Sequence, residues 1–355
     1  MQKIRVLVVE DSLTVRRRLI DVLNSDGAFE VIAEAGDGQQ AIDLCRLLRP
    51  DVITLDMHLP VMDGVSATEH IMGHFPTPIL IVSSSTNRGD LFKTYDALAA
   101  GAVDVLEKPT GLEADGVWEK KFLAAVKLVS RIRVITHVRA RLGGVAPVPV
   151  EVERAHLPKP LAQGCSLIAI GASTGGPGAL VDVLRMVPNN LQATVLIVLH
   201  IDEPFSSAFA DWLGSQTSHS VAYAVGGEQL AAPTKGRVLM APPGHHLVAR
   251  TGRLLLTSEP ERHSCRPSVD VLFESLAVEW GSRTIGCLLT GMGRDGATGL
   301  LSLRRAGAYT IAQDEATSVI YGMPREAALL GAAQSILPLN EIGSVIARLA
   351  AKVNP

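Results

Sequence analysis

A serine between two glycines is the first candidate for chemistry in this chain. The stretch LIAIGASTGGPG places Gly171, Ser173 and Gly175 at the spacing G-x-S-x-G, directly after an apolar run. A turn of this kind, between a strand and a helix, exposes the serine hydroxyl and directs backbone N–H groups at a developing oxyanion. Glycine-rich turns also bind phosphate groups, although this segment lacks the GK[ST] ending of a P-loop. The turn alone leaves a nucleophile and a phosphate site both open.

A nucleophilic serine needs a general base, and the base needs an acid that orients it. His200 ends the apolar run TVLIVLH, and Asp295 lies in the loop LLTGMGRDGATG. Both therefore follow predicted buried strands, as Ser173 does. Because the carboxyl ends of parallel strands share one edge of a sheet, we expect the three side chains to meet there. The alternative role for Asp295 is to cap the helix that follows it.

Three further histidines compete with His200 for the role of base. His245 and His246 open a predicted hairpin, in the segment PPGHH. His263 lies in the polar loop EPERHSCRPS and is a candidate for substrate contact. A lone histidine at a strand end is also commonly a capping or packing residue, so His200 depends on its partners for its assignment.

Carboxylates gather at the predicted strand ends of the first 110 residues. Glu10 and Asp11 follow the run IRVLVV, and Asp56 ends the run DVITLD. Carboxylates at one sheet edge repel each other, and a ligand set made only of oxygen suits Mg²⁺. With a divalent cation present, Asp56 can attack a phosphoryl group whose oxygens Ser83 and Lys108 bind. The five residues together predict a phosphorylation site, whereas any one alone fits a solvated turn.

The elements that must position these residues alternate between apolar runs and amphipathic segments. In the first part of the chain, strands are predicted at 4–9, 29–35, 51–56, 78–84 and 103–108, and helices at 12–24, 38–48, 64–74 and 90–100. In the second part, strands are predicted at 167–170, 194–199, 237–240, 246–249, 253–257, 284–289 and 309–313, and helices at 177–186, 269–279 and 297–306. The pattern predicts an α/β protein. Its N-terminal domain is a flavodoxin-like (βα)5 fold, and its C-terminal domain is a doubly wound, mostly parallel α/β fold with a hairpin insertion near 245–257.

Composition sets the domain plan and excludes several classes of protein. The domains are predicted at 1–125 and 166–355, joined by a linker at 126–165 that is rich in Pro, Gly and polar residues. The formal net charge of −3 gives no bulk positive field for nucleic acid. The chain has no apolar stretch of the ~20 residues that a membrane span needs, no signal-peptide layout and no paired cysteine motif. We expect a cytoplasmic protein that neither binds nucleic acid nor inserts into a membrane.

The N-terminal motifs resemble a two-component response-regulator receiver. The matching segments are VVEDS, TLDMHLPVMDG, VSSS and EKP, and they span about the first 125 residues. The resemblance implies that Asp56 is the phosphoacceptor. It also implies that Glu10 and Asp11 hold Mg²⁺ together with Asp56 and the backbone carbonyl of His58.

The same resemblance assigns the remaining residues of the phosphorylation site. Ser83 matches the hydroxyl that changes position on phosphorylation, and Lys108 matches the lysine that binds the phosphate. The sequence departs from the family pattern at two positions. Glu10 stands where an aspartate is common, and Val105 stands where many receivers carry a switching aromatic residue. Switching is therefore expected to depend on Ser83 and the loop that follows it.

The C-terminal part resembles the catalytic domain of the CheB family of chemotaxis methylesterases. The matching segments are IAIGASTGGP, VLHI, APPGHH, RPSVDVLFESLA, LLTGMGRDGATG and IAQDEATSVIYGMPREA. The resemblance implies Ser173 as nucleophile, His200 as base and Asp295 as the acid that orients it. The order Ser, His, Asp differs from that of α/β-hydrolases, so the serine turn does not imply that fold. Backbone N–H groups at Thr174 and, by the resemblance, Met292 are the candidate oxyanion donors.

The resemblance also implies an activity and its partners. The expected reaction is hydrolysis of glutamate γ-methyl esters on chemoreceptor helices, which releases methanol, together with deamidation of selected glutamines. No cofactor is expected for the ester chemistry. A chemotaxis-type histidine kinase is the expected phosphodonor, and the receiver is expected to act as an inhibitory lid that phosphorylation of Asp56 relieves. A catalytically inactive receptor adaptor and a small-ester hydrolase are the competing interpretations.

Overall fold

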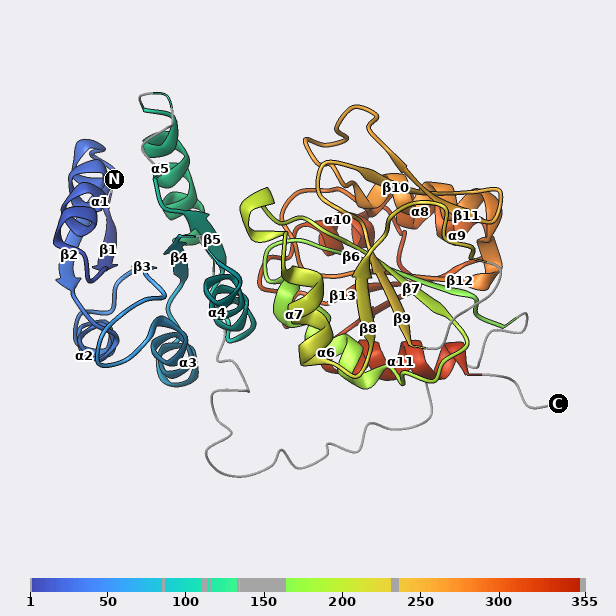
Figure 1. Ribbon diagram of the computed structural model, residues 1–355, viewed down its shortest axis with the longest axis horizontal. Helices are drawn as coiled ribbons and strands as arrows, with labels where there is room; N and C mark the ends of the chain where they lie inside the picture. Colours follow the sequence, from blue (N-terminus) through green and yellow to red (C-terminus); the bar gives the residue numbers. More distant parts are fainter. Residues whose placement is uncertain are drawn as a thin grey trace. The chain divides into compact units, whose positions relative to one another are not determined.

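The computed structural model describes residues 2–84, 87–109, 114, 116–132, 134, 164–230 and 236–351. The chain divides into two compact units, Met1–Val148 and Pro149–Pro355 (Figure 1). Most of the predicted linker lies outside the described residues, between the end of one helix at Val129 and the start of the next strand at Leu167. No helix in the described ranges combines the length and the hydropathy that a membrane crossing requires.

The first unit is built from five βα repeats, as the sequence predicts. Its elements are β1 (Ile4–Val9), α1 (Leu13–Ser25), β2 (Phe29–Ala35), α2 (Gly38–Leu48), β3 (Val52–Leu55), α3 (Gly64–His74), β4 (Ile79–Ser83), α4 (Arg88–Ala99), β5 (Asp104–Glu107) and α5 (Val117–Val129). All strands are parallel in the order β2-β1-β3-β4-β5. Helices α1 and α5 cover one face of the sheet, and α2, α3 and α4 cover the other (Figure 1).

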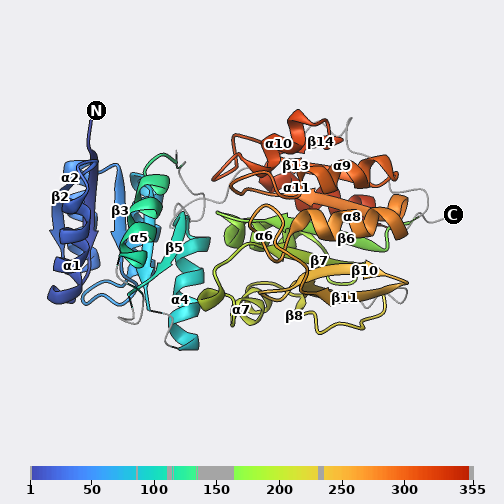
Figure 2. The same cartoon turned by 90° about the horizontal axis from the view of Figure 1, so that it is seen from above.

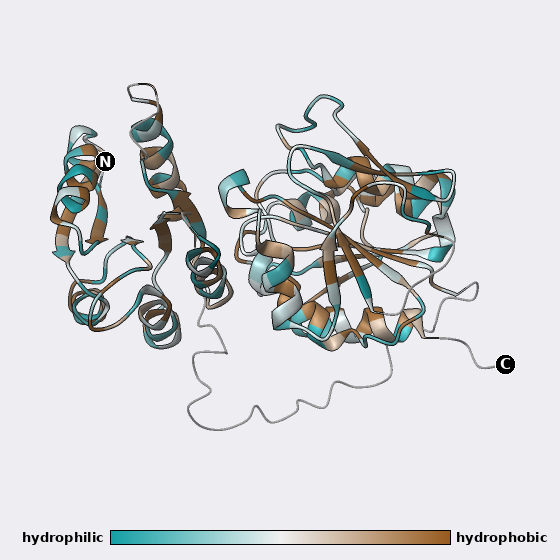
Figure 3. Ribbon diagram, viewed as in Figure 1, coloured by the Kyte–Doolittle hydropathy of each residue, from teal (hydrophilic) through white to brown (hydrophobic). Residues whose placement is uncertain are grey.

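Short polar side chains fix where the helices of the first unit begin. Asp37, Asp63 and Asn87 each accept a hydrogen bond from a backbone N–H in the first turn of α2, α3 and α4, respectively. Such caps satisfy N–H groups that have no partner within the helix. The strands between these helices are apolar and buried, as the hydropathy colouring of Figure 3 shows. The loops after the strands are thereby held at one edge of the sheet.

The second unit is a larger α/β fold. Its elements are β6 (Leu167–Ala172), α6 (Gly176–Met186), β7 (Thr194–Leu199), η3 (Glu203–Phe205), α7 (Phe209–Gln216), β8 (Ser220–Tyr223), β9 (Arg237–Met240), β10 (His246–Arg250), β11 (Arg253–Thr257), α8 (Val269–Glu279), η4 (Gly281–Arg283), β12 (Thr284–Leu288), α9 (Ala297–Arg305), β13 (Tyr309–Gln313), α10 (Met323–Leu329), β14 (Ser335–Leu337) and α11 (Leu339–Ala350). The seven-stranded sheet has the order β14-β13-β12-β6-β7-β9-β8. Every pair in it is parallel.

The strand order makes this sheet doubly wound, as predicted. The chain enters in the middle at β6, continues to its neighbour β7, reaches the edge with β8 and returns to place β9 between β7 and β8; it later fills the other side with β12, β13 and β14. Helices α8, α9 and α10 cover one face, and α6, α7 and α11 cover the other (Figure 1). The predicted hairpin is present: β10 and β11 pair antiparallel and β10 packs against α8, as seen from above in Figure 2.

Besides the short 3-10 helices η3 and η4, five elements of the second unit were not predicted from the sequence: α7, β8, α10, β14 and α11. Strand β8 is a short edge strand with no buried residue, so it gives little hydropathy signal. Helix α11, in contrast, carries a detectable signal. Ile342, Val345, Ile346 and Leu349 recur at helical spacing, and all are buried in the fold.

Candidate active site

The three residues proposed for catalysis lie at the switch point of the seven-stranded sheet. Strand β6 is flanked by β7 on one side and β12 on the other. The strands from β7 to β9 are added on one side of β6, and the strands from β12 to β14 are added on the other. Ser173 directly follows β6, His200 directly follows β7, and Asp295 lies in the loop after β12. Open α/β sheets bind ligands at this kind of position, beyond the carboxyl ends of the strands.

His200 and Asp295 are in direct contact. The imidazole Nε2 lies 3.0 Å from Oδ2 of Asp295. Since a carboxylate only accepts, Nε2 carries the proton and Nδ1 is the nitrogen left to accept one. Nδ1 has the thiol of Cys265 beside it, with Sγ at 3.8 Å. The contact therefore fixes the tautomer that a general base requires.

Asp295 is itself held by the start of α8. Its Oδ1 accepts from the Ser268 hydroxyl at 2.7 Å and from the Asp270 N–H at 3.2 Å, and its Oδ2 accepts from the Val269 N–H at 2.7 Å. The residue is only 3% exposed. The idea that Asp295 caps the helix after it is wrong, because the N-cap of α9 is Gly296 and makes no side-chain bond. It instead serves the N-terminus of α8, whose dipole favours a negative charge.

Opposite charge shifts both partners toward their ionised forms. Burial disfavours the imidazolium of His200, but its bonds to Asp295 and Cys265 outweigh burial and raise its pKa to about 9. Burial also opposes ionisation of Asp295, yet the bonds from His200, Ser268 and Val269 leave its pKa below the ordinary value. Asp295 is thus a carboxylate at neutral pH, and His200 becomes a free base only in alkaline solution unless substrate changes its surroundings.

Ser173 is aligned with His200 through the backbone. Ala172 and Leu199 are register partners in β6 and β7, and the N–H of His200 donates to the carbonyl of Ala172 at 3.0 Å. The two catalytic candidates follow these partners at the same level of the sheet. Within the described part of the chain, the Ser173 hydroxyl makes no hydrogen bond. Catalytic contacts are often long before substrate binds, so the lack of a bond here does not exclude Ser173 as the nucleophile.

Close backbone packing shapes the turn that presents Ser173. The N–H of Ser173 donates to the carbonyl of Thr290 at 3.0 Å, which ties the turn to the loop after β12. A Cβ on Gly291 would lie 2.7 Å from Cβ of Ser173 and 2.4 Å from Sδ of Met323. Gly175 has φ of +78°, and a Cβ there would meet Val319 at 2.6 Å. Glycine is therefore required at both positions.

Two backbone amides remain as candidate oxyanion donors. The Ser173 N–H is already bonded to Thr290 and is unavailable. Among the described residues, neither the Thr174 N–H nor the Met292 N–H donates to another group of the protein. The Met292 side chain is 53% exposed and lines the cleft beside Asp295. Both amides therefore stay predictions for this role.

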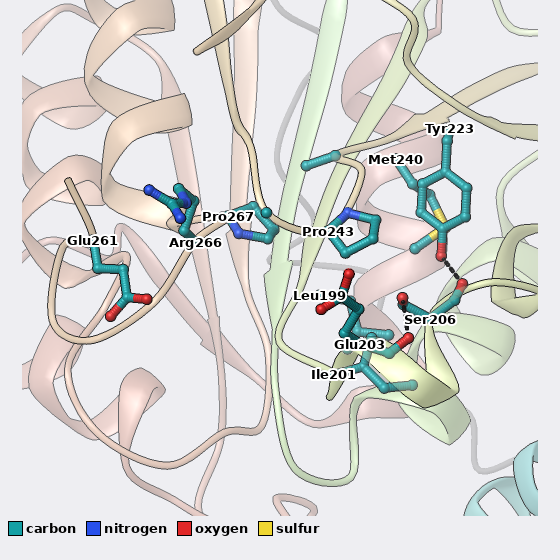
Figure 4. Close-up of a pocket in the computed structure, with 12 residues that line it drawn as sticks. Leu199, Ile201, Glu203, Ser206, Tyr223, Met240, Pro243, Glu261, Arg266 and Pro267 are labelled. Atoms are coloured by element: carbon teal, nitrogen blue, oxygen red, sulfur yellow. Dashed lines mark hydrogen bonds between the residues drawn. The ribbon is translucent and has the colours of Figure 1, made fainter. Parts of the chain in front are cut away.

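Two hollows lie near the candidate residues: Asp295 lines one, and Leu199 and Ile201, the chain neighbours of His200, line the other. One is an open cleft of about 610 Å³ whose walls include Cys265, Arg294 and Asp295. The other, shown in Figure 4, is a pocket of about 230 Å³ beside the end of β7. In that pocket the Tyr223 hydroxyl donates to the Ser206 carbonyl, while Glu203 and Arg266 contribute charged walls.

The acids of the first unit also converge. Strands β1 and β3 are neighbours at the switch point of their sheet, and they carry Glu10, Asp11 and Asp56 at their ends. One carboxylate oxygen from each of the three lies within 4.8 Å of the others. Lys108, which follows β5, places Nζ 2.8 Å from Glu10 and 3.0 Å from Asp56. One ammonium for three carboxylates leaves a net negative site made of oxygen ligands, which fits Mg²⁺.

The same charges perturb the titration of this site. Burial, followed by repulsion from Asp56, raises the pKa of Glu10 even though Lys108 opposes the shift. For Lys108, burial favours the neutral amine, but Asp56 and Glu10 outweigh it and raise the pKa of the ammonium. A bound cation would relieve the strain on Glu10.

Ser83 and His58 occupy positions next to this cluster. Ser83 ends β4, is 1% exposed, and accepts the N–H of Lys108 at its carbonyl. Its side chain is close to the Ser84 carbonyl, with a distance of 3.5 Å. The His58 side chain pairs with Asp90 at 2.8 Å, at the start of α4. The roles of the Ser83 hydroxyl and of the His58 carbonyl remain predictions.

Comparison with known proteins decides the family. Residues 168–346 match the family model described as CheB methylesterase, and residues 6–114 match that of the response regulator receiver domain. The chain belongs to the CheB methylesterase family. It is 43% identical to a protein-glutamate methylesterase/protein-glutamine glutaminase of Nitrosospira multiformis, with 98% of each chain covered. A protein of the same name, numbered 1, from Cupriavidus pinatubonensis is 42% identical over 99% of each chain.

Among solved structures, one match is the CheB methylesterase catalytic domain of Thermotoga maritima. It is 33% identical, has a TM-score of 0.48, and covers 51% of this chain and 96% of that chain. The response regulator domain of Thermotoga maritima CheB is 35% identical, with a TM-score of 0.34, and covers 37% of this chain and 99% of that chain.

In this CheB-family chain the competing histidines have other partners. His246 is fully buried, accepts the Ser268 N–H at Nδ1 and donates through Nε2 to the Pro260 carbonyl. It therefore supports the residue that binds Asp295. His245 points at the Pro243 carbonyl, and His263 contacts Asp270. Neither bonds to Asp295, so His200 is the histidine of this group that does.

Sequence reasoning missed two residues at the site. Cys265 contacts the proton-accepting nitrogen of His200, and Ser268 bonds Asp295. Ser268 could have been found from its place before the amphipathic segment of α8, which is typical of an N-cap. Cys265 carries no such signal, because its contact with His200 joins loops 65 residues apart.

Proposed function

We propose that this protein hydrolyses glutamate γ-methyl esters on chemoreceptors, releasing methanol, and also deamidates selected receptor glutamines. The names of relatives that are 42–43% identical along nearly the whole chain support the reaction and its substrates. The observation that supports the mechanism is the 3.0 Å contact of His200 with Asp295. His200 and Ser173 each directly follow one of two residues, Leu199 and Ala172, that pair in register. An adaptor without activity would not need this arrangement.

The proposed chemistry is acyl transfer from Ser173. Nδ1 of His200 takes the proton as Oγ of Ser173 attacks the ester carbonyl, and the imidazolium then protonates the departing methoxide. Asp295 stabilises the imidazolium and keeps the proton on Nε2. The N–H groups of Thr174 and Met292 bind the oxyanion, a contribution of ~10²–10³ in rate for one such donor. Water, activated by His200, hydrolyses the acyl-enzyme. The amide nitrogen, which departs as ammonia, leaves the tetrahedral intermediate less readily than the ester oxygen, which departs as methanol. Deamidation is therefore slower.

The first unit is proposed to regulate this reaction by phosphorylation of Asp56. Receivers of this class have a Mg²⁺-binding phosphorylation site, and here Glu10, Asp11, Asp56 and the His58 carbonyl would hold the ion, which screens the negative charge around the phosphoryl group. Lys108, already bonded to two of the carboxylates, binds the phosphoryl oxygens. Ser83 is proposed as the hydroxyl that moves toward them.

The proposed domain plan places the receiver at 1–125, a linker at 126–165 and the methylesterase domain at 166–355. A chemotaxis-type histidine kinase supplies the phosphoryl group, and this protein acts in the cytoplasm on methylated receptor helices. The unphosphorylated receiver acts as a lid on the catalytic cleft. A coupling free energy of ~1–3 kcal/mol would give roughly 5- to 150-fold control.

Methanol release from methylated receptor membranes tests the proposal. The wild-type protein should release methanol, and more of it with a small phosphodonor and Mg²⁺. Ser173→Ala should lower release by roughly 10⁴-fold or more while circular dichroism stays unchanged. Deleting residues 1–125 should raise basal release. Equal activity of Ser173→Ala and wild type would refute the nucleophile, and faster turnover of small esters than of receptor would favour a small-ester hydrolase.

A further inference from the structure

A chain of three side chains leads from the interior of the second unit into the cleft beside Asp295. Its inner end is Asp270, in the first turn of α8, which is 0% exposed. The Asp270 carboxylate accepts from the Thr298 hydroxyl and the Gly299 N–H, both at 2.6 Å. It also accepts from Nε2 of His263 at 3.1 Å. A buried carboxylate with this many donors is a fixed anchor.

The middle member, His263, transmits this fixed position outward. Its Nδ1 accepts a hydrogen bond from Nε of Arg294 at 3.3 Å. His263 and Ser264 have φ of +53° and +59°, which are strained values for residues other than glycine. Backbone bonds between Arg262 and Cys265 close the turn around them. The turn thus holds His263 and Ser264 in left-handed backbone conformations, in which the His263 ring contacts Arg294.

The outer member, Arg294, projects from the loop that carries the catalytic acid. It directly precedes Asp295, and it lines the 610 Å³ cleft together with His263, Cys265 and Met292. Only Nε of the guanidinium is bonded, and in the described ranges its two terminal nitrogens have no protein partner. Those nitrogens form the edge that binds a carboxylate through two parallel hydrogen bonds.

Other arginines near the cleft are already engaged. Arg262 binds both carboxylate oxygens of Glu274, at 2.5 and 2.7 Å. Arg266 donates to backbone carbonyls of Ser258 and Glu259. A third, Arg325, pairs with Glu326, whose side chain lines the same cleft. Because Glu326 repels an incoming anion, a substrate carboxylate needs a compensating cation in the same cleft.

We propose that Arg294, oriented by His263 and Asp270, binds a carboxylate of the substrate segment that neighbours the ester. The residue thereby selects for esters in an acidic sequence context. This specificity rests on the proposed methylesterase function. His263 and Asp270 act as positioning residues, because they touch the guanidinium or its support and not the substrate.

Two helical peptides test the inference, each with one glutamate methyl ester. In the first the ester is flanked by glutamates one helical turn away, and in the second by alanines. For Arg294→Gln we expect kcat/KM on the glutamate-flanked peptide to fall roughly 10- to 100-fold through KM, with at most about a twofold change on the alanine-flanked peptide. Arg294→Lys should recover part of the loss. Arg250→Gln, at the exposed last residue of β10, is the matched control and should leave both values unchanged.

A double-mutant cycle tests the positioning chain. His263→Ala should reproduce part of the Arg294→Gln loss on the glutamate-flanked peptide, and adding it to Arg294→Gln should cause little further loss. Equal losses of Arg294→Gln on both peptides, or no loss on either, would overturn the inference. Wild-type protein that releases no methanol from either peptide or from receptor would instead contradict the proposed function, so the two failures are distinguishable.

Discussion

Replacing Asp295 by asparagine should change the pH dependence of the enzyme as well as its rate. Asp295 accepts four hydrogen bonds, from His200, Ser268, Val269 and Asp270. Asparagine has one acceptor oxygen and no charge, so it satisfies only some of these donors in either orientation. Without the carboxylate, only the contact with Cys265 still opposes burial, which is the largest single influence on the imidazole, so the pKa of His200 falls.

The structure gives the size of the effect. The pKa of His200 should fall from about 9 to 6.5 or below, which corresponds to about 3 kcal/mol in the free energy of the imidazolium. Since only neutral His200 can accept a proton, kcat/KM of the wild type should rise with pH through about 9. In Asp295→Asn it should rise through 6.5 or below, to a plateau roughly 10²- to 10⁴-fold lower.

Stability should follow the same linkage. A raised pKa in the folded state means that His200 stabilises the fold fully below pH 6.5 and loses this contribution as the pH rises through about 9. The stability difference between wild type and Asp295→Asn should therefore be largest between pH 3.8 and pH 6.5, because the depressed pKa of Asp295 means that its own contribution is lost at lower pH. It should shrink by about 3 kcal/mol on the alkaline side of pH 9.

The assay is methanol release across pH 5–10, combined with an NMR titration of the His200 ring, assigned by loss of its signal in His200→Gln. Glu259→Gln, an exposed acid in the neighbouring loop, is the matched control and should keep the wild-type midpoint. An Asp295→Asn midpoint indistinguishable from that of the wild type would refute the reasoning, whatever the change in rate.

Three other perturbations have defined outcomes. Lys108→Ala leaves Glu10 and Asp56 without their shared cation, so stimulation by a small phosphodonor and Mg²⁺ should be lost; loss of unstimulated methanol release would contradict this. Gly291→Ala places a Cβ 2.4 Å from Sδ of Met323, so the free energy of unfolding, measured by denaturant titration, should fall by about 1–3 kcal/mol. Gly214→Ala is the control: the nearest atom to its added Cβ lies at 3.7 Å, so the change should be neutral or stabilising. A thiol-alkylating reagent should inhibit methanol release by modifying Cys265, whose Sγ lies 3.8 Å from Nδ1 of His200, because the other three cysteines are buried. Cys265→Ala should resist the reagent, and inhibition of that variant would show that Cys265 is not the residue responsible.

The sequence was sufficient to place the three catalytic candidates after the ends of strands. Ser173, His200 and Asp295 each follow a buried run, and a parallel sheet brings such positions together. The contacts between them could not be predicted in the same way. Nothing local shows that Asp295 bonds the start of α8, 26 residues earlier in the chain, rather than the helix it precedes. The same holds for His246, which resembles a candidate base by sequence and is a buried support for Ser268. These choices depend on how loops pack across the sheet edge, and hydropathy patterns do not record that.

Asp295 has a double attachment with a mechanical consequence. One carboxylate joins the imidazole of His200 to the first turn of α8, so a displacement of that helix is carried to the base through a single side chain. A displacement of Asp295 by a few tenths of an ångström would lengthen its hydrogen bond to His200 and weaken the stabilisation of the imidazolium. A macromolecule that binds α8 and displaces it would thus change the rate of catalysis without entering the cleft.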